Sequence, residues 1–267
     1  AMLARWIGAD MEDIEYTCAG INHTAFYLKY LYRGQDAYPL IRKALKKDEI
    51  WNEEQVRNDM FINLGYYPTE SSGHNSEYNA WFRKRPDLIE KYCTHGTGWN
   101  PGAYGYILDR YLNREDTWAR EYEEWLENGE VQLERGKEYA ANIFNAMFGD
   151  NQPFHFNGNL RNQGYISNVI QGAGVEIPVT ASKDGIMPET VGEIPQHLAV
   201  MINTLAGCEE LAVQGCIEGD CRKIFHSILF DPLTSAVLTM DEIRDMVQEM
   251  FDANKAYLSY FQSLTLE

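Results

Sequence analysis

A short polar turn between two apolar stretches constrains this chain more than any other feature of its sequence. Residues 14–18 alternate in polarity and residues 26–32 are almost wholly apolar and aromatic, so both stretches predict strands. Between them, Gly20 permits a sharp turn or the close approach of a ligand, Asn22 offers an amide, and His23 offers an imidazole, a common metal ligand. The Asn22–His23 pair is therefore either a turn asparagine beside a hydrogen-bonded core histidine, or part of a ligand site.

The composition excludes several classes of partner. The chain has 267 residues, of which 45% are hydrophobic, and a formal net charge of −17. This charge would repel nucleic acid and anionic membranes. No apolar run reaches the ~18 residues that a membrane span needs, and residues 1–10 lack the basic start of a signal peptide. The cysteines are odd in number and form no CxxC, so we expect no disulfide framework and a cytoplasmic location.

The remaining pattern predicts a helix-rich chain with a few strands. The spacing of apolar residues, with capping residues, predicts helices over 40–47, 52–64, 104–133, 134–148, 198–217, 222–230 and 239–261. Further strands are expected from residue 154, running into an Asn/Gly-rich turn by 162, and at 175–179, whereas 83–102 has the composition of an irregular connection. With no repeat or linker, we expect one α+β domain over residues 1–267. Residues 1–8 resemble the end of a helix that starts upstream, which indicates part of a longer chain.

Three further candidates each have two interpretations. In the polar stretch 66–74, Glu70 and His74 could bind a sugar, or the stretch could be turn chemistry with a serine cap and Gly73 at positive φ. Arg161, at the end of the Asn-rich turn, suits a hydroxyl-rich or anionic ligand but is equally typical of a surface turn. Tyr139 begins the inward face of the helix predicted over 134–148, where a core tyrosine is the simpler interpretation.

Several familiar catalytic motifs are missing from the sequence. It contains no GxGxxG after a strand, no P-loop, no GxSxG and no HExxH. Glycosidases that use two carboxylates are not indicated either, because the 40 acidic residues form candidate pairs throughout the chain and none stands out.

The order of seven short motifs carries a resemblance to a known family. They are 18–28 (CAGINHTAFYL), 64–74 (LGYYPTESSGH), 138–146 (EYAANIFNA), 158–162 (GNLRN), 175–178 (VEIP), 192–197 (GEIPQH) and 231–236 (DPLTSA). Taken together, nearly the whole chain resembles the C-terminal part of glycoside hydrolase family 4, most closely its α-galactosidase (melibiase) branch.

The resemblance implies an unusual hydrolytic route that uses NAD and a divalent metal, usually manganese. In this route the sugar is oxidised at C3, a tyrosine removes the proton at C2, the aglycone is eliminated, water adds, and C3 is reduced again. Position by position, His23 matches the metal-binding histidine and Tyr139 matches the base. A phenol becomes a workable base only beside positive charge, so we expect Tyr139 to lie close to the metal held by His23. Four residues are assigned more loosely to sugar binding: Asn22, Glu70, His74 and Arg161.

The resemblance also implies what this chain lacks. In the family, an N-terminal Rossmann domain supplies the NAD site, a cysteine metal ligand and the general acid, and Cys18 is too close to His23 to be that cysteine. We therefore expect no NAD-binding residues here and no glycosidase activity from these residues alone. The expected fold is the α+β domain seen in lactate-dehydrogenase-like enzymes, with a mixed or antiparallel sheet, in a homodimer or homotetramer.

The expected substrate is an α-galactoside of the melibiose or raffinose type. An α-glucosidase, an α-glucuronidase or a 6-phosphoglycosidase is the alternative within the family, although the negative charge and the lack of a basic cluster disfavour anionic sugars. A non-catalytic oligomerisation or sugar-binding module is the alternative from another class.

Overall fold

The computed structural model describes residues 1–93, 111–112, 116–128, 136, 138–150 and 152–266. Its chain contacts form two compact units. The first unit comprises Ala1–Gly102, His155–Thr180 and Ile186–Glu267, and the second comprises Ala103–Phe154 and Ala181–Gly185. The expectation of a single domain stays a prediction.

An antiparallel sheet organises the first unit. Its strands are β1 (Ile14–Ile21), β2 (Thr24–Tyr32), β3 (Gln35–Asp36), β4 (Tyr67–Pro68), β5 (Phe154–Arg161), β6 (Gly174–Ser182) and β7 (Gly185–Pro188). The order is β3-β2-β1-β6-β5, while β4 pairs with β2 and β7 with β6. Strands β1 and β2 form a hairpin, and β1 meets β6 where Gly20 lies opposite Glu176. Strands at 14–18 and 26–32 are thus confirmed, with β1 running on to Ile21.

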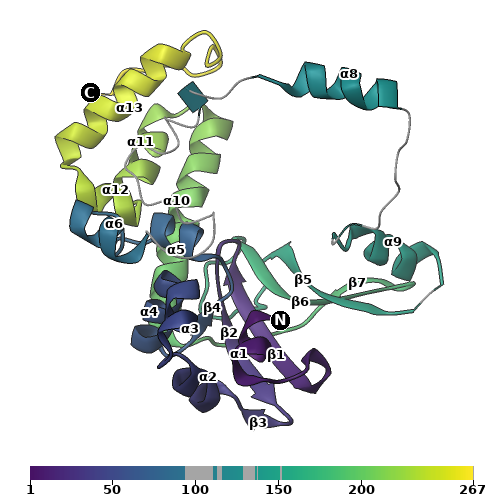
Figure 1. Ribbon diagram of the computed structural model, residues 1–267. Helices are drawn as coiled ribbons and strands as arrows, with labels where there is room; N and C mark the ends of the chain where they lie inside the picture. Colours follow the sequence, from purple (N-terminus) through teal and green to yellow (C-terminus); the bar gives the residue numbers. More distant parts are fainter. Residues whose placement is uncertain (94–110, 113–115, 129–135, 137, 151, 267) are drawn as a thin grey trace. The chain divides into compact units, whose positions relative to one another are not determined.

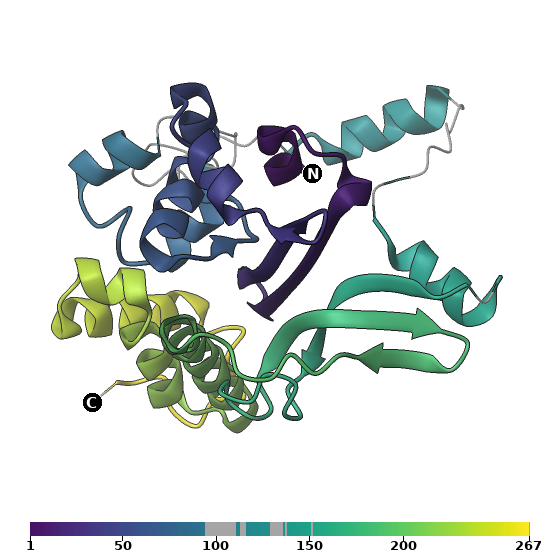
Figure 2. The same cartoon turned by 90° about the horizontal axis from the view of Figure 1, so that it is seen from below.

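Most helices of the first unit lie to one side of the β1–β2 hairpin (Figure 1). The described helices of this unit are α1 (Met2–Ile7), the short 3-10 helix η1 (Met11–Asp13), α2 (Tyr38–Ala44), α3 (Asp48–Glu53), α4 (Gln55–Leu64), α5 (Ser72–Tyr78), α6 (Pro86–Tyr92), α10 (Gln196–Glu218), α11 (Cys221–Leu229), α12 (Pro232–Val237) and α13 (Met240–Asn254). Figure 2 shows the blue helices of residues 38–92 and the yellow-green C-terminal helices on the same side of the purple β1–β2 hairpin. The α+β, helix-rich fold class is confirmed.

The main core lies between the sheet and helices α4 and α10. Phe26 of β2, Ile177 of β6, Val56 of α4 and Ile202 of α10 are fully buried in it. A second core gathers α1, α2, α3, β4 and the outer part of β2, and a third joins α11 to α13 and the C-terminal residues. Burial of apolar surface in the main core fixes the positions of β1, β2 and β6, from which part of the candidate site is built.

Local signals mark several helix ends as expected. Helix α4 ends at Gly65, whose φ of 83° is readily adopted by glycine. The Ser71 hydroxyl accepts the His74 N–H at 3.3 Å and begins α5, so the serine cap is confirmed. Thr239 and Glu242 form the expected capping box of α13.

Other sequence predictions were wrong. Gly73 lies inside α5 and does not have positive φ, because the Ser71 cap starts a helix where a turn was the alternative. Pro86 initiates helix α6 within the stretch expected to be irregular, and the rest of that stretch from residue 94 lies outside the described residues. Helix α13 ends at Asn254 and not near Phe261.

The second unit contains two described helices, α8 (Trp118–Asn128) and α9 (Ala140–Phe148). Trp118, Tyr122 and Trp125 of α8 are all exposed. Helix α9 was expected from residue 134 but begins at Ala140 with Tyr139 as its N-cap, and residues 134, 135 and 137 lie outside the described part. The expected inward face of this helix is only partly formed, since Tyr139 at its start is 43% exposed, while Ile143 and Met147 are half-buried.

Two expectations concern the chain as a whole. All cysteines carry free thiols. Within the described ranges, every helix is too short or too polar to cross a bilayer.

Candidate metal centre

His23 occupies a backbone position that few side chains adopt. Asn22 and His23 are the two turn residues between Ile21 and Thr24, which are paired in the ladder of β1 and β2. The φ of His23 is 65°, in the left-handed region that glycine and asparagine favour. Its side chain is 34% exposed, so it is not the core histidine that was the alternative interpretation. An uncommon backbone conformation at a chemically active side chain is a frequent feature of functional sites.

Gly20 is required by the hairpin itself. A Cβ at Gly20 would lie 2.2 Å from the Thr24 carbonyl oxygen and 2.5 Å from the Ala25 Cα, both backbone atoms. The close approach expected at this glycine is therefore made by the partner strand. The absence of a side chain at residue 20 lets the hairpin close tightly next to the turn that carries the histidine.

Glu70 is the polar partner of His23. The Nδ1 atom of His23 lies 2.8 Å from the Glu70 Oε2 atom, and Oε1 of the same carboxylate accepts the Ser71 N–H at 2.7 Å. Burial acts to raise the pKa of Glu70, but the hydrogen bonds from Ser71 and His23 and the charges of His23 and His74 outweigh it, so its pKa is lowered. Glu70 is therefore an ionised acceptor facing the histidine.

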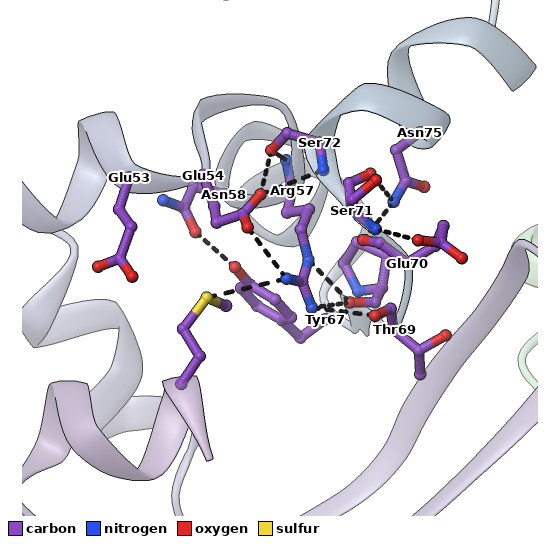
Figure 3. A network of polar contacts seen from close by, with 12 residues as sticks. Glu53, Glu54, Arg57, Asn58, Tyr67, Thr69, Glu70, Ser71, Ser72 and Asn75 are labelled. Atoms are coloured by element: carbon purple, nitrogen blue, oxygen red, sulfur yellow. Dashed lines mark hydrogen bonds and ion pairs between the residues drawn. The ribbon is translucent and has the colours of Figure 1, made fainter. Parts of the chain in front are cut away.

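A buried ion pair supports the loop that carries Glu70 (Figure 3). The Arg57 guanidinium donates to the carbonyl oxygens of Pro68 at 3.0 Å and Thr69 at 3.2 Å, and lies 3.4 Å from Glu54. The second oxygen of Glu54 accepts the N–H of Ser72 at 3.1 Å and its hydroxyl at 2.5 Å. Residues 68–72 are thus held at both ends by charged groups from α4 and the residue before it.

Two aromatic rings lie against His23. Tyr78 is stacked on it, with ring centroids 5.4 Å apart and an interplanar angle of 10°. The His74 ring is 4.6 Å away at 45°, and the His74 Nδ1 lies 4.0 Å from the Glu77 carboxylate. Both rings come from α5, so the cap at Ser71 that starts this helix also presents them to His23.

Further acidic groups surround the histidine. Burial raises the pKa of Glu176 on β6, the Glu70 charge raises it further, and the His23 charge opposes both. Glu209 of α10 is exposed, yet partial loss of solvent raises its pKa, again against the charge of His23. In the sequence, Glu176 stands out as the single acid in an apolar strand, and Tyr78 as an aromatic suited to core packing or to stacking on a sugar. Neither was assigned to the site from the sequence, and Glu209 was missed.

A cavity of ≈ 290 Å³ adjoins this cluster. Its lining includes Tyr78 and Glu209, together with Leu205, Cys208 and Asp231. Tyr78 connects this cavity to the cluster, because its ring also stacks on His23. The mixture of apolar and acidic lining groups suits a small hydroxylated ligand with an apolar ring face.

The structure places the other predicted site residues separately. Asn22 is exposed at the tip of the hairpin beside His23. Arg161 is exposed at the end of β5, where its guanidinium nitrogens lie close to Gly172. Tyr139 is 43% exposed and belongs to the second unit, so its expected approach to the metal stays a prediction.

The donor atoms of the cluster fit a divalent cation. Ligand atoms of His23, Glu70 and His74 lie within 4.8 Å of one another, and among the described residues this is the single such group of His, Cys, Asp or Glu side chains. Imidazole and carboxylate ligands suit borderline and hard divalent cations such as Mn²⁺ and Zn²⁺. The excess of carboxylates around the group favours a cation further.

A match to a family model identifies the family to which the chain belongs. The family 4 glycosyl hydrolase C-terminal domain matches residues 18–234, which include every residue of the cluster described above. The chain belongs to glycosyl hydrolase family 4.

Two of the relatives that match nearly the whole chain are α-galactosidases. An α-galactosidase from Bacillus subtilis (strain 168) is 32% identical and covers 97% of the chain, and one from Rhizobium meliloti (strain 1021) is 30% identical and also covers 97%. The chain spans 59% and 54% of the lengths of these relatives.

Solved structures confirm the fold. A 6-phospho-α-glucosidase from gut microorganisms, in complex with NAD and Mn²⁺, has a TM-score of 0.69 at 20% sequence identity. It covers 95% of this chain, and the chain covers 57% of it. The family 4 C-terminal fold expected from the sequence is therefore confirmed.

Proposed function

We propose that this chain is the metal- and substrate-binding part of an α-galactosidase that requires NAD and Mn²⁺ or another divalent metal. Two relatives that match nearly the whole chain are α-galactosidases. A structural neighbour in complex with NAD and Mn²⁺ supports the cofactor requirement. The proposed substrate is an α-galactoside of the melibiose or raffinose type.

The negative charge around His23 is the observation that supports a neutral sugar as the substrate. The charge of His23 acts to lower the pKa of each of three nearby carboxylates, those of Glu70, Glu176 and Glu209. The charges that act on the pKa values of these three acids are those of His23, His74 and Glu70. Such surroundings attract a divalent cation and repel a phosphate or uronate group. They therefore favour a neutral galactoside over the 6-phosphate and uronate sugars that were the alternatives.

His23 is the proposed protein ligand of the metal in this chain. A bound divalent cation would supply Lewis-acid stabilisation for negative charge that develops on the sugar oxygens. NAD would supply the hydride acceptor for C3, and we propose that residues outside these 267 bind it, because the sequence has no GxGxxG motif. We propose for the same reason that these residues alone are inactive, in a protein that assembles as a homodimer or homotetramer.

Tyr139 is the proposed base that takes the proton from C2 of the sugar. Its hydroxyl must lose its own proton first, which requires a nearby positive charge to lower the pKa of the phenol. Asn22 and His74, both beside His23, are proposed to orient sugar hydroxyls, and Arg161 is proposed to bind a more distant one. The amide and imidazole groups can each donate or accept, which suits hydroxyl groups.

The test compares nitrophenyl α-galactoside, α-galacturonide and 6-phospho-α-glucoside as substrates of the complete protein with NAD and MnCl₂. We expect turnover of the galactoside at a kcat/KM at least tenfold above the other two, and none without NAD or metal. A preference for either anionic sugar would contradict the proposed specificity. Turnover by residues 1–267 alone would contradict the proposed division of the active site.

The role of Tyr139 has its own measurement. We expect Tyr139→Phe to abolish exchange of the C2 proton with deuterium from solvent, with Tyr122→Phe on exposed α8 as the matched control. An unchanged exchange rate in Tyr139→Phe would remove this residue as the base. A binding module without catalysis is the remaining alternative, and it predicts galactoside binding by the complete protein with no turnover.

A further inference from the structure

We propose that Glu70 is a positioning residue that sets the tautomer and orientation of His23, so that the Nε2 atom of His23 faces the divalent cation. The inference rests on the proposed function, in which His23 is a metal ligand. It assigns Glu70 a different role from the sugar binding expected from the sequence. The role also differs from that of a direct metal ligand in the group with His23 and His74, because both Glu70 carboxylate oxygens are already hydrogen-bonded, one to His23 and one to Ser71.

The hydrogen bond between the two side chains determines the tautomer. An ionised carboxylate can only accept, so the Nδ1 atom of His23, 2.8 Å from Glu70 Oε2, must carry the proton. A neutral imidazole protonated at Nδ1 has its lone pair at Nε2. Metal-bound histidines usually donate their second ring N–H to a carboxylate or carbonyl group in this way, which fixes the ring and raises the basicity of the ligand.

Glu70 is itself held in place, which a positioning role requires. Its Oε1 atom accepts the Ser71 N–H at 2.7 Å, and its backbone carbonyl accepts the Asn75 side-chain amide at 2.8 Å. One residue earlier, the Thr69 N–H donates to the Ala25 carbonyl at 2.9 Å, which ties this loop to the hairpin that carries His23. The carboxylate therefore cannot turn toward a sugar without losing a hydrogen bond at each oxygen.

The ion pair of Figure 3 extends this support into the buried interior. Arg57 is 9% exposed and Glu54 is 5% exposed, and together they bond to Pro68, Thr69 and Ser72, the residues that flank the Glu70–Ser71 pair. Burial of two opposite charges is favourable only when further hydrogen bonds satisfy both, as they do here. Such a rigid second layer is what keeps a ligand histidine in a precise geometry.

The test measures Mn²⁺ binding to the complete protein by electron paramagnetic resonance, without substrate. Glu70→Ala is expected to weaken Mn²⁺ binding about 10- to 100-fold. Glu70→Gln should have a smaller effect, because its amide oxygen still accepts from Nδ1 but lacks the charge. Glu77→Gln in α5 is the control, since the Glu77 carboxylate pairs with His74 and not with His23, and the Mn²⁺ Kd of this variant should stay within twofold of the wild type. Thermal unfolding without metal establishes that each variant is folded.

Kinetics separate positioning from sugar binding. With saturating Mn²⁺, the KM of Glu70→Gln for the galactoside should stay within about threefold of the wild type, while the Mn²⁺ concentration for half-maximal rate rises as Kd does. A raised KM with unchanged Mn²⁺ affinity would overturn the inference and return Glu70 to sugar binding. If Glu70→Gln fails to fold, Glu70→Ala and Glu70→Asp are measured in its place. Unchanged Mn²⁺ affinity in both of these variants would also overturn the inference.

His23→Asn distinguishes failure of the inference from failure of the proposed function. Asparagine tolerates the left-handed backbone of this turn, so the variant should fold. Loss of Mn²⁺ binding in His23→Asn together with normal binding in both Glu70 variants would refute the positioning role alone. Normal Mn²⁺ binding in His23→Asn would refute both the role of His23 as a metal ligand and the role of Glu70 as its positioning residue.

Discussion

The ring of Tyr78 lies parallel to the ring of His23, with centroids 5.4 Å apart and planes inclined by 10°. His23 comes from a hairpin turn and Tyr78 from the last residue of α5, so the contact joins two elements that are far apart in the chain. Stacking restrains the plane of the imidazole, while the hydrogen bond between Nδ1 and Glu70 restrains the direction in which that ring edge points. Together the two contacts leave the His23 ring with one favoured orientation.

Removal of the stacked ring should therefore loosen the metal site. We expect Tyr78→Ala to weaken Mn²⁺ binding several-fold and to lower the free energy of unfolding by on the order of 2 kcal/mol, because a half-buried ring is lost. Tyr78→Phe keeps the stacked ring and is the matched control. Urea unfolding and Mn²⁺ titration measure the two effects, and equal Mn²⁺ affinity in the Ala and Phe variants would show that stacking does not orient His23.

Gly20→Ala should disrupt the hairpin that carries His23. The added methyl would meet backbone atoms of Thr24 and Ala25 at 2.5 Å or less, which no side-chain rotation can relieve. We expect a loss of about 3 kcal/mol or more in the free energy of unfolding. Gly174→Ala in β6 is the control, since a methyl group added there would have no other atom within 4 Å, and it should change stability by no more than about 0.5 kcal/mol. Similar effects of the two substitutions in urea unfolding would contradict the steric argument.

Arg57→Leu should affect both stability and metal binding. The substitution leaves Glu54 buried without its ion-pair partner and removes the donors to Pro68 and Thr69, so we expect a loss of about 3–5 kcal/mol. Arg5→Leu is the control: Arg5 also pairs with a glutamate, Glu53, but its side chain is 62% exposed, and the expected loss is at most about 1 kcal/mol. Mn²⁺ affinity should fall in the Arg57 variant alone, and a parallel fall in the Arg5 variant would mean that the effect is not specific to the Glu70 loop.

Glu176→Gln should stabilise the metal-free protein at neutral pH. Burial and the Glu70 charge raise the pKa of Glu176 above its ordinary value of 4.5, so the folded state holds this proton more tightly than the unfolded state does. The resulting destabilisation is absent below pH 4.5, grows as the pH rises through the raised pKa, and is fully present above it. Glutamine carries no charge, so the difference in unfolding free energy between variant and wild type should grow over this window.

Urea unfolding from pH 4.5 upward, without metal, measures this difference. Glu15→Gln is the control, because the Glu15 side chain is 65% exposed and its difference from wild type should be small at every pH. A difference for Glu176→Gln that shrinks as pH rises would contradict the assigned direction of the shift.

The sequence by itself determined the local structure around the site. Gly20 and the polar pair Asn22–His23 between two apolar strands predicted the hairpin, because side-chain polarity alternates with the strand period. Thr239 predicted the start of α13, because a hydroxyl in that position satisfies a free N–H of the first turn. The serine cap considered within residues 66–74 starts α5, a helix that the sequence did not predict. The ordered motifs also indicated the family, since seven short matches in one order are far more specific than any single match.

The tertiary structure decided which side chains meet. Glu70 lies 47 positions from His23, and Glu176 and Glu209 lie farther along the chain, so no local period could relate them. They meet because β1 pairs with β6 at Gly20 and Glu176, and because α10 packs against the sheet in the main core. The free energy that brings them together comes from apolar burial elsewhere in the molecule, which is not directional and which a local pattern of residues therefore does not encode.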